Sequence, residues 1–176
     1  KLYCPNTNTV KPIISSVNTS SYFGLLCSGG EIDISGLQIS YLNTSGFVIN
    51  STSTLTKLDN VNFTSGQAGG VHLDVSNGAT KTLSLCTYDD IVSGKNVRVS
   101  NGTKLSFVGW TKGNNSDIIV DGTSSIDWIT GNILIVSATP TSLRADDLAI
   151  STITAIFTAY PNIPLPGTVN ITVSGT

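Results

Sequence analysis

The sequence of 176 residues is short of the groups on which most protein chemistry depends. It contains no methionine, one histidine and one glutamate, and charged residues make up only 11% of the chain. Nine basic residues and eleven acidic ones give a net charge of −2, without a basic stripe that could neutralise a phosphate backbone. We therefore expect no nucleic-acid partner.

Long apolar runs are missing too. The longest, such as Ile133 to Val136 and Ala155 to Phe157, fall far short of the roughly 20 residues that a helix needs to cross a bilayer. The mature chain is therefore predicted to hold no membrane span. Because the chain starts at Lys1 and lacks methionine, we interpret it as a processed form whose secretory signal has been removed.

Serine, threonine and asparagine fill 61 of the 176 positions, so the surface is expected to be polar without being charged. Seven asparagines stand in Asn-X-Ser/Thr sequons and are candidate sites for N-linked glycans, with ordinary turn residues as the alternative. They are Asn18, Asn43, Asn50, Asn62, Asn101, Asn114 and Asn170. A glycosylated chain is expected outside the cell.

Three cysteines, Cys4, Cys27 and Cys86, are disulfide candidates. An odd number leaves one thiol free or bonded to another chain, and which two would pair stays open. No Cys-X-X-Cys spacing occurs, so a zinc site is not expected. No cofactor or metal is predicted.

Apolar and polar residues alternate at period two along most of the chain, which predicts strands. Val71 to Val75 is typical of a half-buried strand. In Glu31 to Tyr41 the apolar phase switches at Gly36, which predicts one strand bent at a bulge. The one helical candidate is a single turn near Leu143 to Leu148.

Three similar segments, each built on an Asn-Gly or Asp-Gly turn signal, recur in the middle of the chain at offsets of 24 and 21 residues. Their dipeptides are Asn77-Gly78, Asn101-Gly102 and Asp121-Gly122. A β-solenoid would reuse a coil at about this period, but the flanking sequences do not repeat. Recurring hairpins are therefore the preferred interpretation, with a solenoid as the alternative.

About a dozen short strands separated by turn residues predict an all-β fold, an antiparallel β-sandwich of the immunoglobulin-like or pilin-like kind. Residues 1–20 contain Pro5 and Pro12 but no glycine, which predicts an extended N-terminal arm. Residues 21–176 are predicted to form the sandwich head.

The arm is interpreted as a donor strand that completes the sheet of a neighbouring subunit. The strand from Val169 to Val173, which follows the proline-rich spacer Tyr160 to Gly167, is the alternative donor. In the third alternative neither end is exchanged.

Catalytic motifs are missing: the chain has no nucleophile elbow, no phosphate loop and no His-Glu-X-X-His. His72 lies opposite its apolar neighbours in a strand and is expected on the solvent face. The pairs Asp89-Asp90 and Asp146-Asp147 are predicted to cap turns, not to bind calcium or catalyse. Trp110 and Trp128 are predicted to be core residues, not a sugar-binding platform. We therefore expect no enzyme.

The processed start, the charge-poor Ser/Thr/Asn-rich composition, the sequons and the arm from Lys1 to Ser20 together resemble subunits of archaeal surface filaments built by donor-strand complementation. The particular likeness is to the thread pilus of thermoacidophilic archaea, and it covers the whole chain. The resemblance implies a β-sandwich whose arm enters the next subunit through Val10, Ile13 and Ile14, and sugars on the sequon asparagines.

The function predicted on this basis is that of a structural subunit of an extracellular pilus on the cell surface. Identical subunits would polymerise head-to-tail and support adhesion or biofilm formation. The alternative is a glycan-binding adhesin or a viral surface module with a β-solenoid or β-sandwich fold. A secreted polysaccharide hydrolase is disfavoured because no constellation of carboxylates is present.

Overall fold

The computed structural model describes residues 1–5, 11–129, 133–139 and 152–158. The chain divides into two compact units, Lys1–Ile129 and Thr130–Thr176. This division differs from the predicted one into an arm of residues 1–20 and a head of residues 21–176. All the regular elements among the described residues are strands, so the all-β part of the prediction is confirmed.

The strands of the first unit form three sheets, and every hydrogen-bonded pair of strands in these sheets is parallel. The first sheet contains β1 (Leu2–Pro5), β2 (Ile13–Ser15), β4 (Gly30–Ser40), β6 (Ser53–Thr64), β9 (Thr87–Tyr88) and β12 (Thr111–Lys112). The second contains β3 (Phe23–Cys27), β5 (Leu42–Ile49), β7 (Val71–Val75), β10 (Lys95–Val99) and β13 (Ile118–Ile119). The third contains β8 (Thr80–Ser84), β11 (Lys104–Val108) and β14 (Ser125–Trp128).

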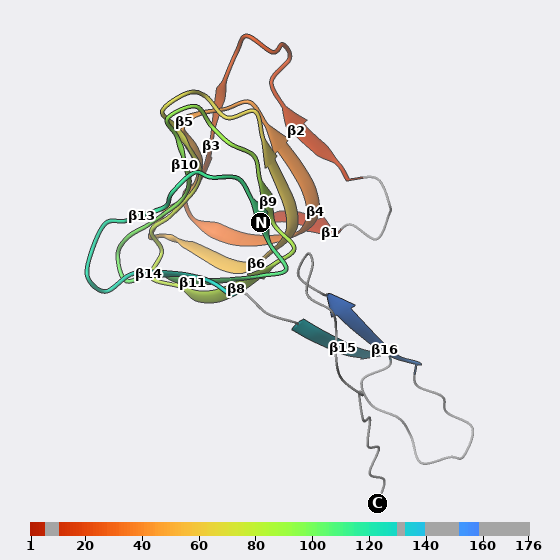
Figure 1. Cartoon of the computed structure of the whole chain (residues 1–176). Coiled ribbons are helices and arrows are strands. Elements are labelled where there is room, and N and C mark those ends of the chain that lie inside the picture. The colour runs from red at the N-terminus through yellow and green to blue at the C-terminus, as the bar shows by residue number, and fades with distance from the viewer. Residues whose placement is uncertain (6–10, 130–132, 140–151, 159–176) are drawn as a thin grey trace, which may run out of the picture. The chain divides into compact units, whose positions relative to one another are not determined.

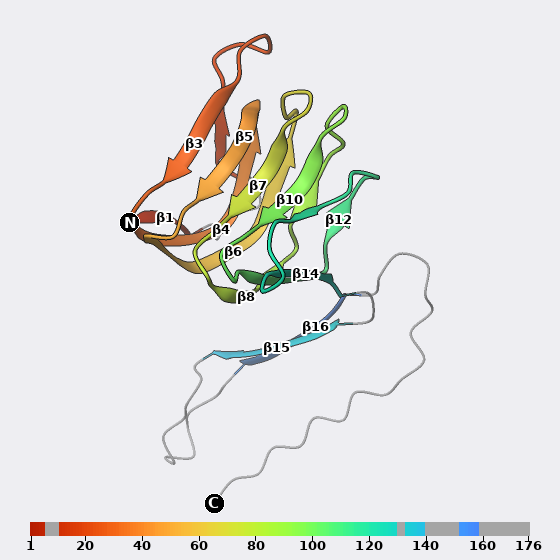
Figure 2. The same cartoon turned by 90° about the vertical axis from the view of Figure 1, so that its left-hand side faces the viewer.

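Successive strands of one sheet are separated by one circuit of the chain. Leu73 pairs with Val97, and Lys104 pairs with Ser125, at the sequence offsets of 24 and 21 residues that the similar segments have. The first unit is therefore a β-solenoid of about five coils. Figure 1 looks along the stacked coils, and Figure 2 shows β3, β5, β7 and β10 side by side with their arrows in the same direction. The predicted antiparallel β-sandwich is wrong.

The hairpin interpretation is wrong for the same reason. After Val75 the chain does not fold back on β7 but turns a corner into β8, which belongs to another sheet. Gly78 and Gly102 have φ values of 69° and 74°, so they supply the left-handed backbone that the corner needs. The predicted left-handed backbone is confirmed at Gly78 and Gly102 but not at Asp121-Gly122. At Gly78 and Gly102 both flanking strands pair with the neighbouring coils and not with each other.

A second corner explains the phase switch in β4. Gly36 and Asn60 both have positive φ, and pairing on either side of them continues without a slip, from Ser35 with Asp59 to Leu37 with Val61. Leu85 and Gly109 repeat the left-handed conformation in the next two coils. The predicted switch at Gly36 is confirmed, but its cause is a shared corner and not a bulge.

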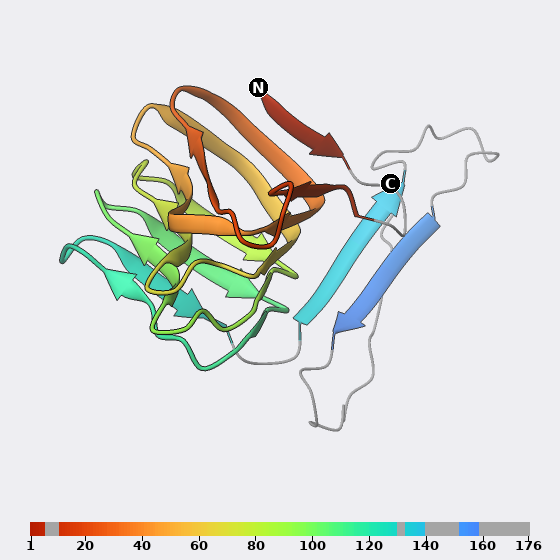
Figure 3. The same cartoon turned by 90° about the horizontal axis from the view of Figure 1, so that it is seen from above.

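The core lies inside the coils, where the apolar side chains of successive strands stack in register. Phe47 pairs with Leu73, and Leu73 with Val97, and none of the three is exposed to solvent. Phe63 and Tyr88 pair in the first sheet and stack their rings at 5.0 Å between centroids. We call β1 to β3 the first coil, β4 to β10 the middle coils and β11 to β14 the last coil; Figure 3 shows their order from red to teal.

The second unit contains the single antiparallel pair among the described residues. β15 (Ile133–Thr139) and β16 (Thr152–Thr158) pair from Ile133 with Thr158 to Thr139 with Thr152. The predicted helical turn at 143–148, the acidic pair Asp146-Asp147 and the C-terminal strand at 169–173 lie outside the described residues.

Candidate functional site

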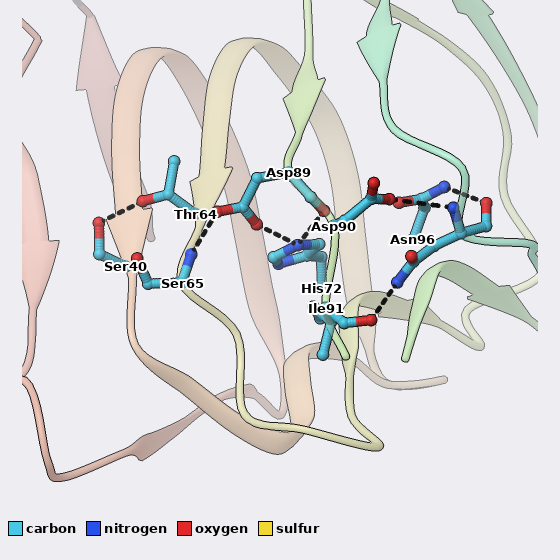
Figure 4. Close-up of polar contacts among 9 residues, drawn as sticks. Ser40, Thr64, Ser65, His72, Asp89, Asp90, Ile91 and Asn96 are labelled. Atoms are coloured by element: carbon cyan, nitrogen blue, oxygen red, sulfur yellow. Dashed lines mark hydrogen bonds and ion pairs between the residues drawn. The ribbon is translucent and has the colours of Figure 1, made fainter. Parts of the chain in front are cut away.

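Polar side chains at the corner between the first and second sheets join the coils one after another (Figure 4). Ser40 Oγ and Thr64 Oγ1 lie 2.7 Å apart, and the backbone N–H of Ser65 donates to Asp89 Oδ2 at 2.7 Å. One coil further on, the backbone N–H of Asn115 donates to Asp90 Oδ1 at 3.1 Å. We call this set of contacts the corner ladder. Asp89 and Asp90 were predicted to cap turns, but each accepts a backbone N–H from a neighbouring coil.

His72 joins the corner ladder from β7 and is fully buried. Its side chain is 0% exposed, and its Nε2 lies 2.9 Å from Asp89 Oδ1 and 3.0 Å from the Asp89 carbonyl oxygen. Because both partners are acceptors, Nε2 carries a hydrogen. Phe63 and Tyr88 flank the imidazole at 5.9 and 6.1 Å between ring centroids. The prediction that His72 faces solvent is wrong.

A histidine and a carboxylate in contact are also the parts of a proton-transfer pair. Here the imidazole is fully buried, while the Asp89 side chain is 42% exposed. Nδ1 of His72 is buried and has no hydrogen-bond partner among the described residues. The described residues form no pocket, and no group of three metal-binding side chains is found among them. The geometry of His72 and Asp89 fits a contact between coils.

Asn115 links three segments at the last rungs of the corner ladder. Its Nδ2 donates to the carbonyl oxygen of Ile91 at 2.8 Å, and its own carbonyl oxygen accepts from Asn96 Nδ2 at 2.6 Å. The Asn96 side chain is fully buried, and this bond compensates its Nδ2 for the loss of water, while Oδ1 has no hydrogen-bond partner among the described residues. No local sequence pattern singles out Asn96 or Asn115, because their partners come from other coils.

The Asn-Gly and Asp-Gly positions form a second set of rungs. Asn77 Nδ2 donates to the Ser53 carbonyl oxygen at 3.2 Å, and Asn101 Nδ2 to that of Ser76 at 3.0 Å. Asp121 Oδ2 accepts from the Asn101 backbone N–H at 2.5 Å, while Oδ1 caps the next turn. These hydrogen bonds hold the pKa of Asp121 well below its usual range, the largest contribution coming from Thr123.

The two tryptophans close the core at the last coil. Trp128 stacks on Phe107 with 4.1 Å between centroids and donates from Nε1 to Asp117 Oδ2 at 2.5 Å. Lys112 Nζ lies 4.4 Å from the centre of the Trp128 ring and 3.3 Å from Asp117 Oδ2. Trp110 and Trp128 are both partly buried and pack against the core without belonging to its buried residues, so the prediction of core residues is confirmed only in part.

The sequon asparagines are spread over several corners. Asn18, Asn101 and Asn114 are exposed, whereas Asn43, Asn50 and Asn62 are half-buried. Asn50 Nδ2 donates to Ser28 Oγ at 2.9 Å, and Asn62 Oδ1 accepts from Thr87 and Lys11. Asn170 lies outside the described residues, and glycosylation of all seven stays a prediction.

The predicted donor arm has partners within its own chain. Leu2 pairs with Ile32 and Ile13 with Gln38, so β1 and β2 both lie beside β4. Ile13 is 61% exposed, while Ile14 packs against the core. Val10 lies outside the described residues. These strands therefore have a partner without a second subunit, and donation by Val10, Ile13 and Ile14 stays a prediction.

The cysteines are free thiols. Cys4 and Cys27 are half-buried in the first coil, and Cys86 lies fully buried in the core. Burial raises the pKa of the Cys86 thiol to about 12. The predicted disulfide therefore has no counterpart within the described chain.

No family model, no curated protein and no solved structure matches this chain. Among the described residues no helix has the length and apolar character required to cross a bilayer.

Proposed function

We propose that this chain is a structural module, a rigid β-solenoid that serves as a building element of an extracellular surface assembly and carries out no catalysis. The observation that supports this most is that His72 and Asp89, which could do chemistry, contact each other between coils. Asp74 and Arg98 do the same, since they form an ion pair between β7 and β10.

The exterior location rests on the surface composition. Serine, threonine and asparagine make up about a third of the chain, and among the described residues no hydrogen bond involves the amide nitrogens of the exposed sequon residues Asn18 and Asn114. A glycan on either nitrogen would point away from the core without breaking a contact between coils. A pilus-like filament of identical, glycosylated subunits remains the form of assembly that we propose.

The proposal is tested by assaying the chain for enzymatic activity and, independently, for cooperative folding. We expect no hydrolysis of polysaccharide, ester or peptide substrates, and native-state hydrogen exchange should find β4 to β10 protected as one cooperative unit. A hydrolysis activity that disappears in a folded His72→Gln variant, but survives in a His72-independent control such as Asp127→Asn, would contradict the structural role.

Glycan binding is a second candidate, favoured by one row of side chains on the outer face of the first sheet. Gln38, Asn62, Thr87 and Thr111 occupy matching positions in successive coils. Neighbouring strands lie about 4.8 Å apart, so the row offers amides and hydroxyls at a regular spacing to an extended sugar chain.

This candidate predicts that Thr87→Lys weakens binding in a glycan array or in affinity electrophoresis. Thr82→Lys is the matched control, because Thr82 is an exposed residue of the third sheet. Equal binding by both variants would assign the glycan to another face.

A further inference from the structure

Both ends of the solenoid present free strand edges. Among the described residues β1 and β2 pair only with β4, and β3 pairs only with β5. At the opposite end β12, β13 and β14 likewise each have one neighbour. Unpaired backbone N–H and C=O groups along such an edge are a template for a further strand.

The core is also incompletely covered at the first coil. Leu25 pairs with Phe47 one coil further on, yet Leu25 is only partly buried whereas Phe47 is 0% exposed. On the outer side of the same coil, Ile13 and Leu26 are 61% and 62% exposed. Terminal repeats of a solenoid usually carry a polar outer face, and the first coil has the opposite character.

The last coil matches the first in apolar character and differs from it in net charge. Ile119 and Val120 are 51% and 59% exposed. The last coil, residues 104–128, contains three aspartates and two lysines, of which Lys112 pairs with Asp117, while the first coil, residues 2–27, contains one lysine and no acidic residue. A contact between unlike ends therefore joins coils of opposite net charge, whereas two first coils would bring positive charges together.

We propose that the first coil of one copy docks on the last coil of a second copy, so that the copies stack head-to-tail. In this arrangement β3 lies beside β13 and β1 or β2 beside β12, with the strands parallel as they are between coils within the chain. The inference rests on the proposed structural role and names its partner, a second copy of this chain. A contact between unlike ends does not close on itself, so the stack grows as a filament.

The test uses the full chain and two variants that each block one end. Leu26→Lys places a charge on the free edge at β3, and Ile119→Lys does so at β13. Val92→Lys is the control, because Val92 is 76% exposed but lies in a loop of the middle coils. Sedimentation velocity over a range of concentrations measures assembly, and circular dichroism confirms that each variant is folded.

The wild-type chain and Val92→Lys should form open-ended oligomers, while each end variant alone should stay monomeric, with association weakened at least tenfold. An equimolar mixture of the two end variants should give a dimer that grows no further, since one intact first coil meets one intact last coil. Dimers of Ile119→Lys alone would instead indicate contact between two first coils. Dimers of Ile119→Lys alone, or a wild-type chain that stays monomeric, would overturn the head-to-tail stacking. If the monomeric wild-type chain is cooperatively folded, the proposed structural role is not affected.

Discussion

In β4, within the middle coils, the inward side chains of Ile32, Ile34 and Ile39 are at most 1% exposed, whereas Phe23 and Leu25 in β3 of the first coil are only partly buried. In both strands every second side chain points inward, although β3 carries Gly24 and Leu26 at its outward positions where β4 carries polar residues such as Asp33 and Gln38. The difference is the number of neighbours, because β4 pairs on both sides and β3 on one. In a solenoid, burial is therefore completed by the next coil as well as by the residue's own strand.

The largest difference in stability between the middle coils and the first coil is expected from a matched pair of glycine substitutions. Gly46 in β5 has φ +73°, and a Cβ there would lie 2.1 Å from the Val71 carbonyl oxygen. Gly46→Ala should lower the free energy of unfolding by about 3 kcal/mol or more, because the backbone of the adjacent coil must move. At Gly24 in β3 the nearest atom to a Cβ would be Asn43 Nδ2, at 3.0 Å, on a side chain that can rotate. Gly24→Ala should stay within about 1 kcal/mol of wild type in urea unfolding.

A pair of leucines should show a smaller contrast. Leu73 is 0% exposed between two coils, so Leu73→Ala should cost about 2 to 5 kcal/mol through lost burial and the cavity left behind. Leu25→Ala should cost under about 2 kcal/mol, because its side chain already contacts water. Equal losses in thermal and urea unfolding would mean that the first coil is packed as tightly as the middle ones.

One backbone position in the middle coils is strained, and a substitution there should relieve the strain. Leu85 has φ 56° and is 39% exposed, and Asn60 takes the same corner position in the preceding coil. Asparagine tolerates the left-handed conformation better than leucine, so Leu85→Asn should raise stability by up to about 1 kcal/mol. A loss of stability would show that the contact of Leu85 with Gly109 outweighs the backbone strain.

The smallest effect is expected at the last coil and depends on pH. The pKa of Asp121 is lowered from its ordinary 3.8 by hydrogen bonds to the carboxylate, so the ionised form stabilises the folded chain above about pH 4. Asp121→Asn should lower the melting temperature at pH 7, since an amide cannot accept at both oxygens. As the pH falls through the lowered pKa, wild type loses this contribution and the difference should shrink. Asp127→Asn, on an exposed residue of β14, is the control for the change of charge at this coil.

The repeat length of the solenoid could be recognised in the sequence from the spacing of its similar segments. Val75 pairs with Val99, at the 24-residue offset of the similar segments. The flanks do not repeat because a coil only needs apolar residues inside and suitable corner residues, while outward positions and loop lengths are free to vary. The strands β9 and β12, of two residues each, are too short to give a repeated pattern.

The corner ladder was harder to predict from the sequence. In an isolated strand the alternation of apolar and polar residues would leave His72 exposed to solvent. In the folded chain Asp89, 17 residues further along and in the next coil, contacts the imidazole and covers it. Asp90 meets Asn115 in the same way, 25 residues along the chain. Contacts between coils depend on where the chain returns, and no local pattern encodes that position.

The sequence by itself determined the strands, the left-handed corners and the inward residues, because alternation and backbone preference act over a few neighbouring positions. Only the tertiary structure decided that the strands are parallel and that His72, Asp89 and Asn115 form rungs between coils. The physical reason is that a backbone edge can pair with a strand of either direction, and the choice is made by the packing of whole coils.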